Sequence, residues 1–272
     1  MNDFEDRVAV ITGGAAGIGR AMARAFASRG AHLVLADIDE PALADAEAEF
    51  AAAGTRVLGV PTDVRERESV FALAEATDRA FGRAHIVCNN AGVAPVGSAV
   101  GADPSDWQIS LGINFWGVVH GIDAFVPRLL EQNDGGHVVN TASMAGLTGM
   151  LGLGMYCASK FAVVGLTESL HRELRDRNIG VSVLCPMIVD TDIGVNSRRM
   201  LGQAAPAPDN SDGSAQNLLR GGVIPVESVA KRVVRAIERK DLYIFTHPEQ
   251  RDILRRHSAR LDAMFEDDMW AL

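Results

Sequence analysis

Short apolar runs alternate with stretches of helical periodicity along almost the whole chain. Seven runs rich in β-branched residues are predicted strands: 7–12, 32–37, 56–63, 85–90, 137–143, 181–186 and 242–246. Most are apolar on both faces, as expected of a parallel sheet that is covered on each side. The stretches between them are predicted helices: 17–29, 40–52, 66–80, 105–131, 157–177 and 226–239. This βαβ alternation predicts an α/β fold, a doubly wound parallel sheet of about seven strands with helices on both faces.

No internal repeat or linker interrupts this pattern, so residues 1–272 are expected to form a single domain. One segment breaks the rhythm, at about 190–222, where glycine, proline, asparagine, aspartate and serine gather in GQAAPAPDNSDGS. Structureless segments of this length inside a compact domain are usually lids or mobile loops. We therefore predict a mobile substrate loop at about 190–222.

Composition and charge exclude several classes of function. Lysine and arginine number 26 against 35 aspartates and glutamates, a net charge of −9, and no basic run occurs, so neither nucleic acid nor an anionic membrane is an expected partner. Cys88, Cys157 and Cys185 lack CxxC spacing and the seven histidines lack HxxxH or HExxH spacing, so we expect neither a disulfide nor a metal site. The first apolar run is too short for a signal peptide, and no stretch approaches the roughly 20 apolar residues that span a bilayer. A soluble cytoplasmic protein is expected.

A glycine-rich loop, TGGAAGIG at 12–19, directly follows the first predicted strand and opens the first predicted helix. Gly13, Gly17 and Gly19 allow a tight turn and a close approach of the backbone to a diphosphate. The free N–H groups and the positive dipole end of the helix then favour phosphate. The alternative is a simple turn between strand and helix, although the flanking strand and helix favour a dinucleotide site.

Two carboxylates follow at strand ends. Asp37 ends the second strand 18 residues after Gly19, where a carboxylate accepts hydrogen bonds from adenosine ribose hydroxyls and repels a 2′-phosphate. This predicts NAD rather than NADP, because no lysine or arginine stands at 14–16 or 38. Asp63 and Val64 end the third strand and could flank the adenine. Capping of the following helix is the alternative for both aspartates.

The sequence YCASK, at 156–160, places a phenol and an ammonium four residues apart. In a helix, Tyr156 and Lys160 then share a face. Taken alone, such a pair is usually a packed ring beside a solvated ammonium. Ser143 lies 13 residues before Tyr156, just past a predicted strand end, where ligands gather in open α/β sheets. With the glycine loop also present, the pair is better interpreted as a proton-transfer unit.

These motifs, in this order, resemble those of the short-chain dehydrogenases/reductases. The resemblance rests on TGGAAGIG, Asp37, NNAG at 89–92, Asn114, Ser143, YCASK, and Pro186 with Thr191, and it spans residues 8–191. It implies a Rossmann-type fold and an NAD-dependent oxidoreductase that transfers a hydride to or from a secondary alcohol or ketone. One departure is Met187, which follows Pro186 where the family often has glycine, close to the nicotinamide amide.

The resemblance assigns roles to four predicted catalytic residues. Tyr156 is the acid/base, and a neighbouring cation together with an oxidised nicotinamide should lower its pKa below the ordinary value near 10. Lys160 also holds the nicotinamide ribose, Ser143 orients the carbonyl and stabilises the developing alkoxide, and Asn114 binds a water that links Lys160 to solvent. The predicted cofactor-binding residues are Gly13, Ala16, Gly17, Ile18, Gly19, Asp37, Ile38, Asp63, Val64, Asn90, Ala91, Gly92, Thr141, Tyr156, Lys160, Pro186, Val189 and Thr191.

The substrate is expected to be a neutral and hydrophobic small molecule. Residues 144–155, MAGLTGMLGLGM, carry no charge and lead directly into Tyr156. Arg198 and Arg199 offer an alternative, a clamp for a substrate carboxylate, and the tail LYIFTHPEQR at 242–251 resembles the branch that oxidises aryl alcohols. Helices 105–131 and 157–177 would, by resemblance, form the contacts of a homotetramer or homodimer. A non-catalytic cofactor sensor, or a lyase or dehalogenase on the same scaffold, are the competing function classes.

Overall fold

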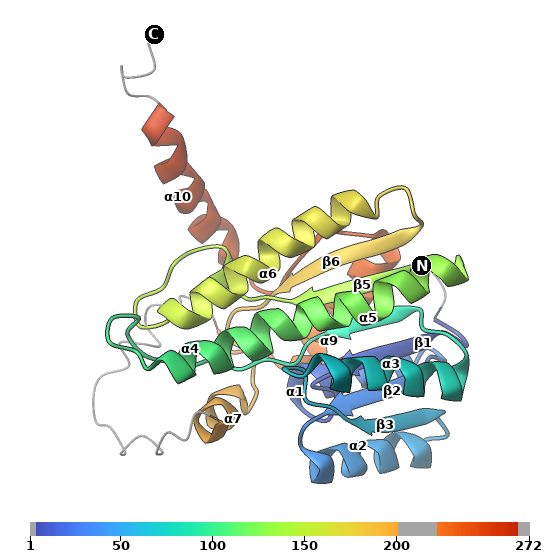
Figure 1. Cartoon of the computed structure of the whole chain (residues 1–272). Coiled ribbons are helices and arrows are strands. Elements are labelled where there is room, and N and C mark those ends of the chain that lie inside the picture. The colour runs from blue at the N-terminus through green and yellow to red at the C-terminus, as the bar shows by residue number, and fades with distance from the viewer. Residues whose placement is uncertain (1–3, 201–221, 266–272) are drawn as a thin grey trace.

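Seven parallel strands form one sheet in the computed structural model, which describes residues 4–200 and 222–265 (Figure 1). The strand order is β3-β2-β1-β4-β5-β6-β7. The strands are β1 Val8–Thr12, β2 His32–Asp37, β3 Val57–Pro61, β4 Ile86–Asn89, β5 Gly136–Thr141, β6 Ile179–Cys185 and β7 Tyr243–Phe245. The predicted doubly wound parallel sheet is therefore confirmed.

Helices cover both faces of the sheet because successive residues of each central strand are apolar. In β1, Ala9 and Ile11 pack into one core cluster, while Val8 and Val10 pack into the other. The first cluster includes side chains of α1 (Gly17–Ala27), α2 (Glu40–Ala52) and α9 (Val226–Arg239). The second includes side chains of α3 (Arg67–Phe81), α5 (Gly117–Gln132) and α6 (Gly154–Glu173). This two-sided burial is the arrangement that the apolar runs predict.

The predicted helix 105–131 is a continuous helical run with a local irregularity. It consists of α4 (Pro104–Leu111), a π-helical turn η1 (Gly112–Trp116) and α5. By length and composition the run could cross a membrane, but 56% of its most apolar window is buried inside the fold, as in a core helix. Because π-helical turns concentrate at functional sites, the position of η1, which contains Asn114, is informative.

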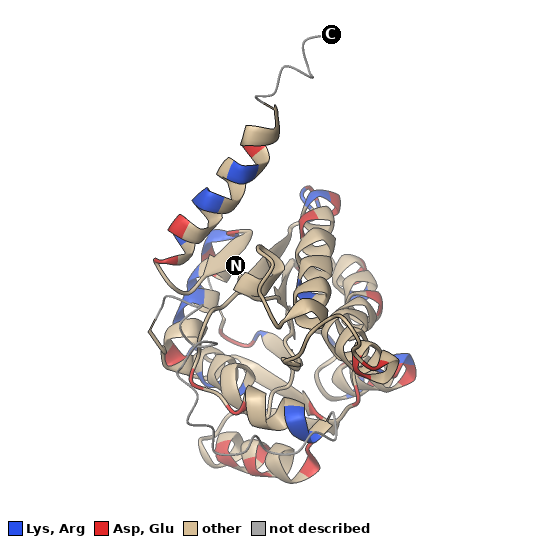
Figure 2. Cartoon of the chain, turned by 90° about the vertical axis from the view of Figure 1, so that its left-hand side faces the viewer, with Lys and Arg blue, Asp and Glu red and all other residues tan. Residues whose placement is uncertain are grey.

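Several predicted boundaries are wrong by a few residues. The third strand stops at Pro61 rather than 63, the sixth starts at Ile179 rather than 181, and the helix after YCASK ends at Glu173 rather than 177. Within the predicted mobile loop, residues 193–200 form α7 (Ile193–Met200), and residues 201–221 lie outside the described residues. An unpredicted helix, α10 (Gln250–Asp262), extends away from the body of the molecule and carries several arginines (Figure 2).

The strand order reverses between β1 and β4, and this is where open α/β sheets bind ligands. β1 pairs with β2 on one side and with β4 on the other, so the connections after β1 and β4 leave in opposite directions. Their carboxyl ends are tied together by Thr12, whose hydroxyl accepts hydrogen bonds from the amides of Asn90 (2.9 Å) and Ala91 (3.1 Å). The glycine loop and NNAG therefore meet at one crevice.

Candidate active site

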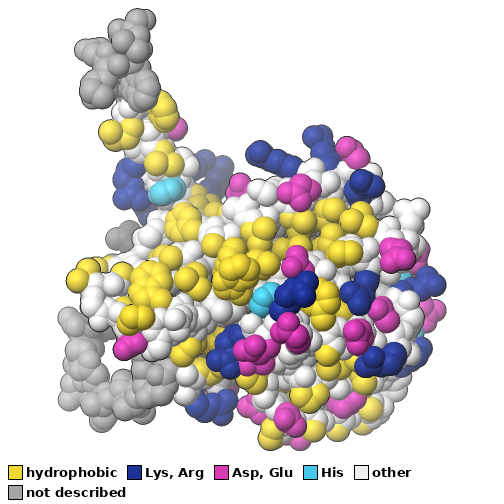
Figure 3. All heavy atoms as spheres, in the orientation of Figure 1, with side chains coloured by type: hydrophobic (Ala, Val, Ile, Leu, Met, Phe, Trp, Pro, Cys, Tyr) yellow, Lys and Arg dark blue, Asp and Glu magenta, His cyan; other side chains and the backbone are white. Residues whose placement is uncertain are grey.

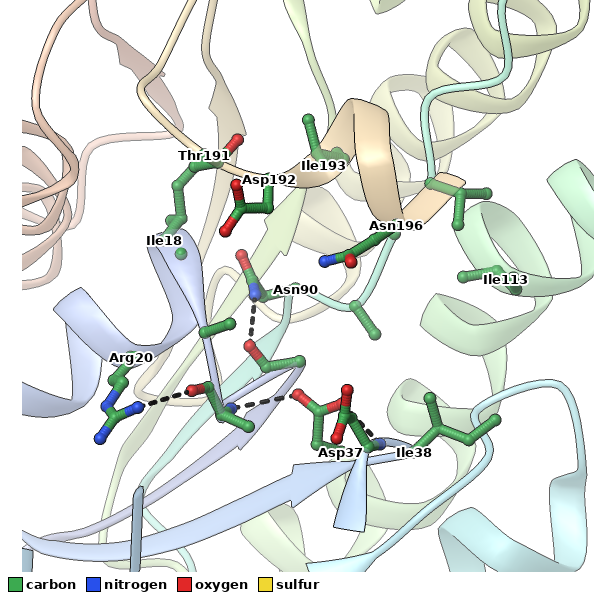
Figure 4. A pocket seen from close by; sticks show the side chains of 18 of the residues that line it. Ile18, Arg20, Asp37, Ile38, Asn90, Ile113, Thr191, Asp192, Ile193 and Asn196 are labelled. Carbon is green, nitrogen blue, oxygen red and sulfur yellow. Dashed lines mark hydrogen bonds between the residues drawn. The ribbon is translucent and has the colours of Figure 1, made fainter. Parts of the chain in front are cut away.

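A cavity of about 1200 Å³ lies at the carboxyl ends of the strands, where the sheet order reverses (Figure 4). It runs from the β2 end, at Asp37, to Tyr156 and Lys160 on α6. Of the predicted cofactor-binding residues, all but Gly19 and Val189 line it. Val189 instead forms a backbone bridge with Ile224. The structure thus brings residues from six separate predicted motifs into one cavity.

The glycine loop is packed so closely at Gly13 and Gly19 that a side chain would not fit there. Gly13 has a φ of +63°, in the region that favours glycine, and a Cβ on Gly19 would lie 2.0 Å from the Gly13 carbonyl oxygen. Ala16, at the start of α1, is extended and caps the helix with no side-chain hydrogen bond. The first N–H groups of α1 are therefore available to an anion in the cavity, as a phosphate-binding loop requires.

Asp37 is oriented by the backbone at the other side of that loop. Its two carboxylate oxygens accept hydrogen bonds from the amides of Ala15 and Asp39, each at 3.1 Å (Figure 4). Asp39, rather than Asp37, caps α2 by accepting from the amide of Ala42 at 3.2 Å. The alternative role of Asp37 as a helix cap is thus wrong, and its carboxylate is held in place facing the cavity.

Asp63 has a partner that the sequence did not indicate. Arg65 makes side-chain hydrogen bonds to it at 2.5–3.0 Å, and this contact lowers the pKa of the Asp63 carboxyl. The N-cap of α3 is Glu66, so the capping alternative for Asp63 is wrong. Val64 is buried, and its carbonyl accepts a hydrogen bond from Nδ1 of His120 on α5 at 2.9 Å. Both residues line the cavity, but any ligand of Asp63 competes with Arg65.

Tyr156 and Lys160 share one face of α6, as the spacing predicts. Lys160 is 3% exposed, its Nζ lies 5.7 Å from the centroid of the Tyr156 ring, and it donates to the Thr141 carbonyl at 2.9 Å. Burial lowers the pKa of Lys160 to about 8. Burial also raises the pKa of Tyr156, although a hydrogen bond with Ser143 acts in the opposite direction. Without the cofactor, desolvation outweighs the neighbouring groups, and the predicted lowering of the Tyr156 pKa, which includes the charge of an oxidised nicotinamide, stays a prediction.

Ser143 lies beside Tyr156 in a short turn after β5. Its hydroxyl accepts from the amide of Ala145 at 3.2 Å and donates to the Pro186 carbonyl at 3.4 Å. The latter distance is near the upper limit for a hydrogen bond, so this donor could turn to a stronger acceptor. Ser143 thus lies next to Tyr156, which lines the cavity, although Ser143 itself is not among the lining residues.

Asn114 is fully buried, and both polar atoms of its side-chain amide are hydrogen-bonded within the described residues. Oδ1 accepts from the Val93 amide at 2.9 Å, while Nδ2 donates to the Val93 carbonyl (2.9 Å) and to Oγ of Ser159 (3.0 Å). The Ser159 hydroxyl in turn donates to the Tyr156 carbonyl at 2.8 Å. A Cβ on Gly92 would lie 3.1 Å from Oδ1 of Asn114 and 3.4 Å from Nζ of Lys160. Asn114 therefore joins η1 to the turn of α6 that carries Tyr156.

Two features beside the cavity were not assigned a role from the sequence. Thr12, the first residue of TGGAAGIG, fixes Asn90 and Ala91, and its position at the end of the first strand is a usable signal. α7 forms a wall through Ile193, Asn196 and Arg199 (Figure 4). Arg199 pairs with Asp39 at 3.3 Å, across 160 positions of sequence, for which no local pattern exists. Arg199 is therefore paired at the Asp37 end of the cavity, and the alternative of Arg198 and Arg199 as a clamp for a substrate carboxylate stays a prediction.

Several known proteins are similar to this chain in sequence, and solved structures are similar to it in fold. The family profile described as "short chain dehydrogenase" matches residues 7–202. A "CLA biosynthesis dehydrogenase/reductase" of Lactiplantibacillus plantarum is 33% identical and covers 96% of this chain and 95% of its own. A "C alpha-dehydrogenase" of Sphingobium is 33% identical over 94% of this chain and 86% of its own. A crystal structure of a short-chain dehydrogenase/reductase from Burkholderia phymatum in complex with NAD has a TM-score of 0.89, 41% identity and 97% coverage of both chains.

Proposed function

The chain belongs to the short-chain dehydrogenase/reductase family, and from this membership we propose that it transfers a hydride between NAD(H) and a neutral, hydrophobic secondary alcohol or ketone. The observation that carries the proposal is the placement of Tyr156 and Lys160 in the lining of the cavity that also contains the glycine loop, with Ser143 in contact with Tyr156. The proposed acid/base and the proposed cofactor-binding loop thereby line the same cavity.

The cavity fits the cofactor, and the cofactor is NAD. The uncapped start of α1 would hold the diphosphate, Asp37 the adenosine ribose, and Lys160 the nicotinamide ribose. The arginines near Asp37 are already paired with carboxylates: Arg20 and Arg24 with Glu49, and Arg199 with Asp39. None of these three arginines is an unpaired cation that could attract a 2′-phosphate, and this supports NAD over NADP.

Tyr156 and Ser143 control the transfer of the alcohol proton. When bound, oxidised NAD supplies the hydride acceptor and a positive charge near the phenol. That charge opposes the desolvation that raises the pKa of Tyr156. Tyr156 then takes the proton of the alcohol, or returns it to the oxygen during ketone reduction. Ser143 turns its hydroxyl from the Pro186 carbonyl to the substrate oxygen and stabilises the charge that develops there.

Apolar residues in the cavity lining support an apolar substrate. They include Val93, Ile113, Ile193 and Met200. The exposed Val96 and Leu151 lie on two loops joined by a hydrogen bond from the Gly97 amide to the Gly152 carbonyl at 2.8 Å. A pocket of this kind favours a carbon skeleton over a charged group. An aryl-substituted secondary alcohol is the first substrate to test, given the resemblance of the tail LYIFTHPEQR.

The direct experiment is to mix the purified protein with NAD and a panel of secondary alcohols, and to follow the absorbance of NADH. Turnover of apolar secondary alcohols, and none of carboxylate-bearing ones, is the expected result. Binding of NAD without turnover of any alcohol or ketone would favour the cofactor-sensing alternative. Neither binding nor turnover would favour a lyase or dehalogenase.

We also propose that the protein is a soluble cytoplasmic homotetramer or homodimer. Trp116, Leu130 and Phe161 are exposed on η1, α5 and α6, and apolar side chains gather over this face (Figure 3). Such a patch marks a protein interface more often than free surface. Light scattering after size exclusion should give two or four times the chain mass of 29.0 kDa.

A further inference from the structure

A cluster of buried polar side chains lies at the carboxyl end of β7, beyond the residues to which the reaction assigns a role. Thr246 is 2% exposed, His247 5% and Gln250 1%. The three come from the tail LYIFTHPEQR and from the first residue of α10. Burying such groups is costly unless each is hydrogen-bonded, so their partners show what the cluster holds.

A directed chain of hydrogen bonds runs through Thr246 and His247. The amide of Met187 donates to Thr246 Oγ1 at 3.2 Å, Thr246 Oγ1 lies 2.7 Å from His247 Nδ1, and His247 Nε2 lies 2.8 Å from the Gly222 carbonyl. A carbonyl only accepts, so Nε2 carries a proton. In the neutral ring Nδ1 is then an acceptor, and the Thr246 hydroxyl donates to it. The two side chains therefore connect Met187 to Gly222.

Gln250 holds the same turn from the other side. Its Oε1 accepts from the amides of Thr246 and His247, each at 2.9 Å. Its Nε2 donates to the Cys185 carbonyl at 2.7 Å and contacts the Met144 sulfur at 3.4 Å. One amide group thus fixes the turn after β7 against the end of β6.

The backbone positions held by this cluster border the reacting end of the cavity. Pro186, which lines the cavity between Cys185 and Met187, accepts at its carbonyl from Ser143 Oγ and from the Met144 amide (2.9 Å). Gly222 begins the segment that pairs with residues 188–190 through Ile224, whose amide donates to the Ile188 carbonyl at 3.2 Å. The cluster is therefore tied to Gly222 directly, and through Gly222 and Ile224 it adjoins the backbone at 188–190.

We infer that Thr246 and His247, supported by Gln250, are positioning residues for hydride transfer. Thr246 sets the Pro186–Met187 backbone and, through it, the acceptor to which Ser143 is bonded. His247 sets the position of Gly222 and, through Ile224, of the backbone at 188–190 that leads to Thr191 in the cavity lining. The inference rests on the proposed function. It predicts that the two residues affect different kinetic constants: Thr246 mainly kcat, and His247 mainly the KM of the alcohol.

Four variants separate these roles. Thr246→Val removes both hydrogen bonds and keeps the shape, whereas Thr246→Ser keeps the hydroxyl. In His247→Asn the amide oxygen can replace the Nδ1 acceptor but the side chain is too short for Gly222. In His247→Gln the amide nitrogen can replace the Nε2 donor. Thr77→Val is the matched control, since Thr77 is a buried threonine that donates to the Leu73 carbonyl at 2.9 Å in α3, on the other side of the fold.

Thr246→Val should lower kcat about tenfold or more with little change in the alcohol KM, because a misplacement of about 1 Å costs up to roughly 100-fold. Thr246→Ser should keep kcat within about threefold. His247→Asn should raise the alcohol KM about three- to tenfold, the effect of one lost hydrogen bond, and His247→Gln should restore it. Thr77→Val should change neither constant. If Thr246→Val does not fold, Thr246→Ala takes its place.

Hydrogen exchange of the free protein supplies a readout independent of turnover. Thr246→Val should speed exchange of the Met187 amide, and His247→Asn that of the Asp190 and Ile224 amides. Faster exchange in Thr246→Val and His247→Asn with wild-type kcat and KM would overturn the positioning role. Equal KM values for His247→Asn and His247→Gln would also overturn it, and so would a loss of kcat in Thr77→Val. A wild-type protein that oxidises no alcohol and reduces no ketone would refute the proposed function instead, and would take this role with it.

Discussion

Replacing Asp37 with asparagine should reverse or abolish the preference for NAD over NADP. The carboxylate ends β2 and is held by the amides of Ala15 and Asp39, each at 3.1 Å, so its free lone pairs face the cavity. Asparagine keeps the shape of the side chain and removes the charge. A hydroxyl bonded to a carboxylate gains about 1.5–3 kcal/mol, against about 0.5–1.5 kcal/mol for a neutral acceptor. The difference, about 1–1.5 kcal/mol, predicts a rise of roughly 5- to 10-fold in the Kd of NAD.

The same substitution has a second effect that must be separated from the first. The asparagine amide turns a donor toward one of the two loop amides and costs about 1–3 kcal/mol in loop stability. That cost falls equally on NAD and NADP, because both use the same glycine loop. The ratio of the two Kd values is therefore the quantity to measure, by calorimetric titration of each nucleotide. Repulsion of the 2′-phosphate is also relieved, so the ratio should shift by at least about tenfold toward NADP.

Asp192→Asn is the matched control. Asp192 also lines the cavity, next to Thr191, but lies on the wall opposite Asp37 (Figure 4). Asp192→Asn changes the net charge by the same amount as Asp37→Asn. It should leave the ratio of the two Kd values within about twofold of wild type, because solvent and salt screen a charge on the opposite wall. An unchanged ratio in Asp37→Asn, or a wild-type protein that binds NADP as tightly as NAD, would refute the assignment of Asp37 to the ribose.

Three further outcomes follow from the site. Gly19→Ala should weaken NAD binding by at least about 100-fold in titrations, because its Cβ would lie 2.0 Å from the Gly13 carbonyl oxygen and the loop must move; wild-type affinity would contradict the cradle. Ser143→Ala should lower kcat by roughly 10²–10³-fold with NAD affinity retained, the loss expected for one oxyanion donor. Lys160 has its pKa lowered from 10.5 to about 8 by burial, so the unfolded state binds more protons between those values, and the free energy of unfolding should rise with pH across them. Denaturant titrations from pH 8 to 10.5 should show that rise, at most about 3 kcal/mol, relative to Lys160→Met; parallel profiles would contradict it.

The sheet and the position of the cavity could be predicted from the sequence because their causes are local. Each central strand is a run of apolar residues that buries both of its faces, as Val8–Ile11 do in β1. The glycine loop and Asp37 follow strand ends directly, and a parallel sheet brings such ends to one edge. The four-residue spacing of Tyr156 and Lys160 likewise fixes their common face on α6.

What the sequence did not supply depends on contacts between distant segments. Spacing places Lys160 beside Tyr156, but it gives no sign that the Thr141 carbonyl takes the ammonium or that burial raises the phenol's pKa. The pair of Arg199 with Asp39 joins segments 160 residues apart, so no local pattern announces it. The π-helical turn around Asn114 lies within an apolar helical run whose periodicity looks regular.

The central claim, that the Tyr156 phenol transfers the proton, is tested most directly by the kcat of Tyr156→Phe on an alcohol that the wild-type protein oxidises with NAD. Phenylalanine keeps the ring that packs near Lys160 and removes only the hydroxyl, so the fold and the Kd of NAD, measured by titration of the same sample, should stay within a few-fold of wild type. The account predicts that kcat falls by about 10²–10⁴-fold, the usual contribution of a general acid–base group. A kcat within a few-fold of wild type would contradict it.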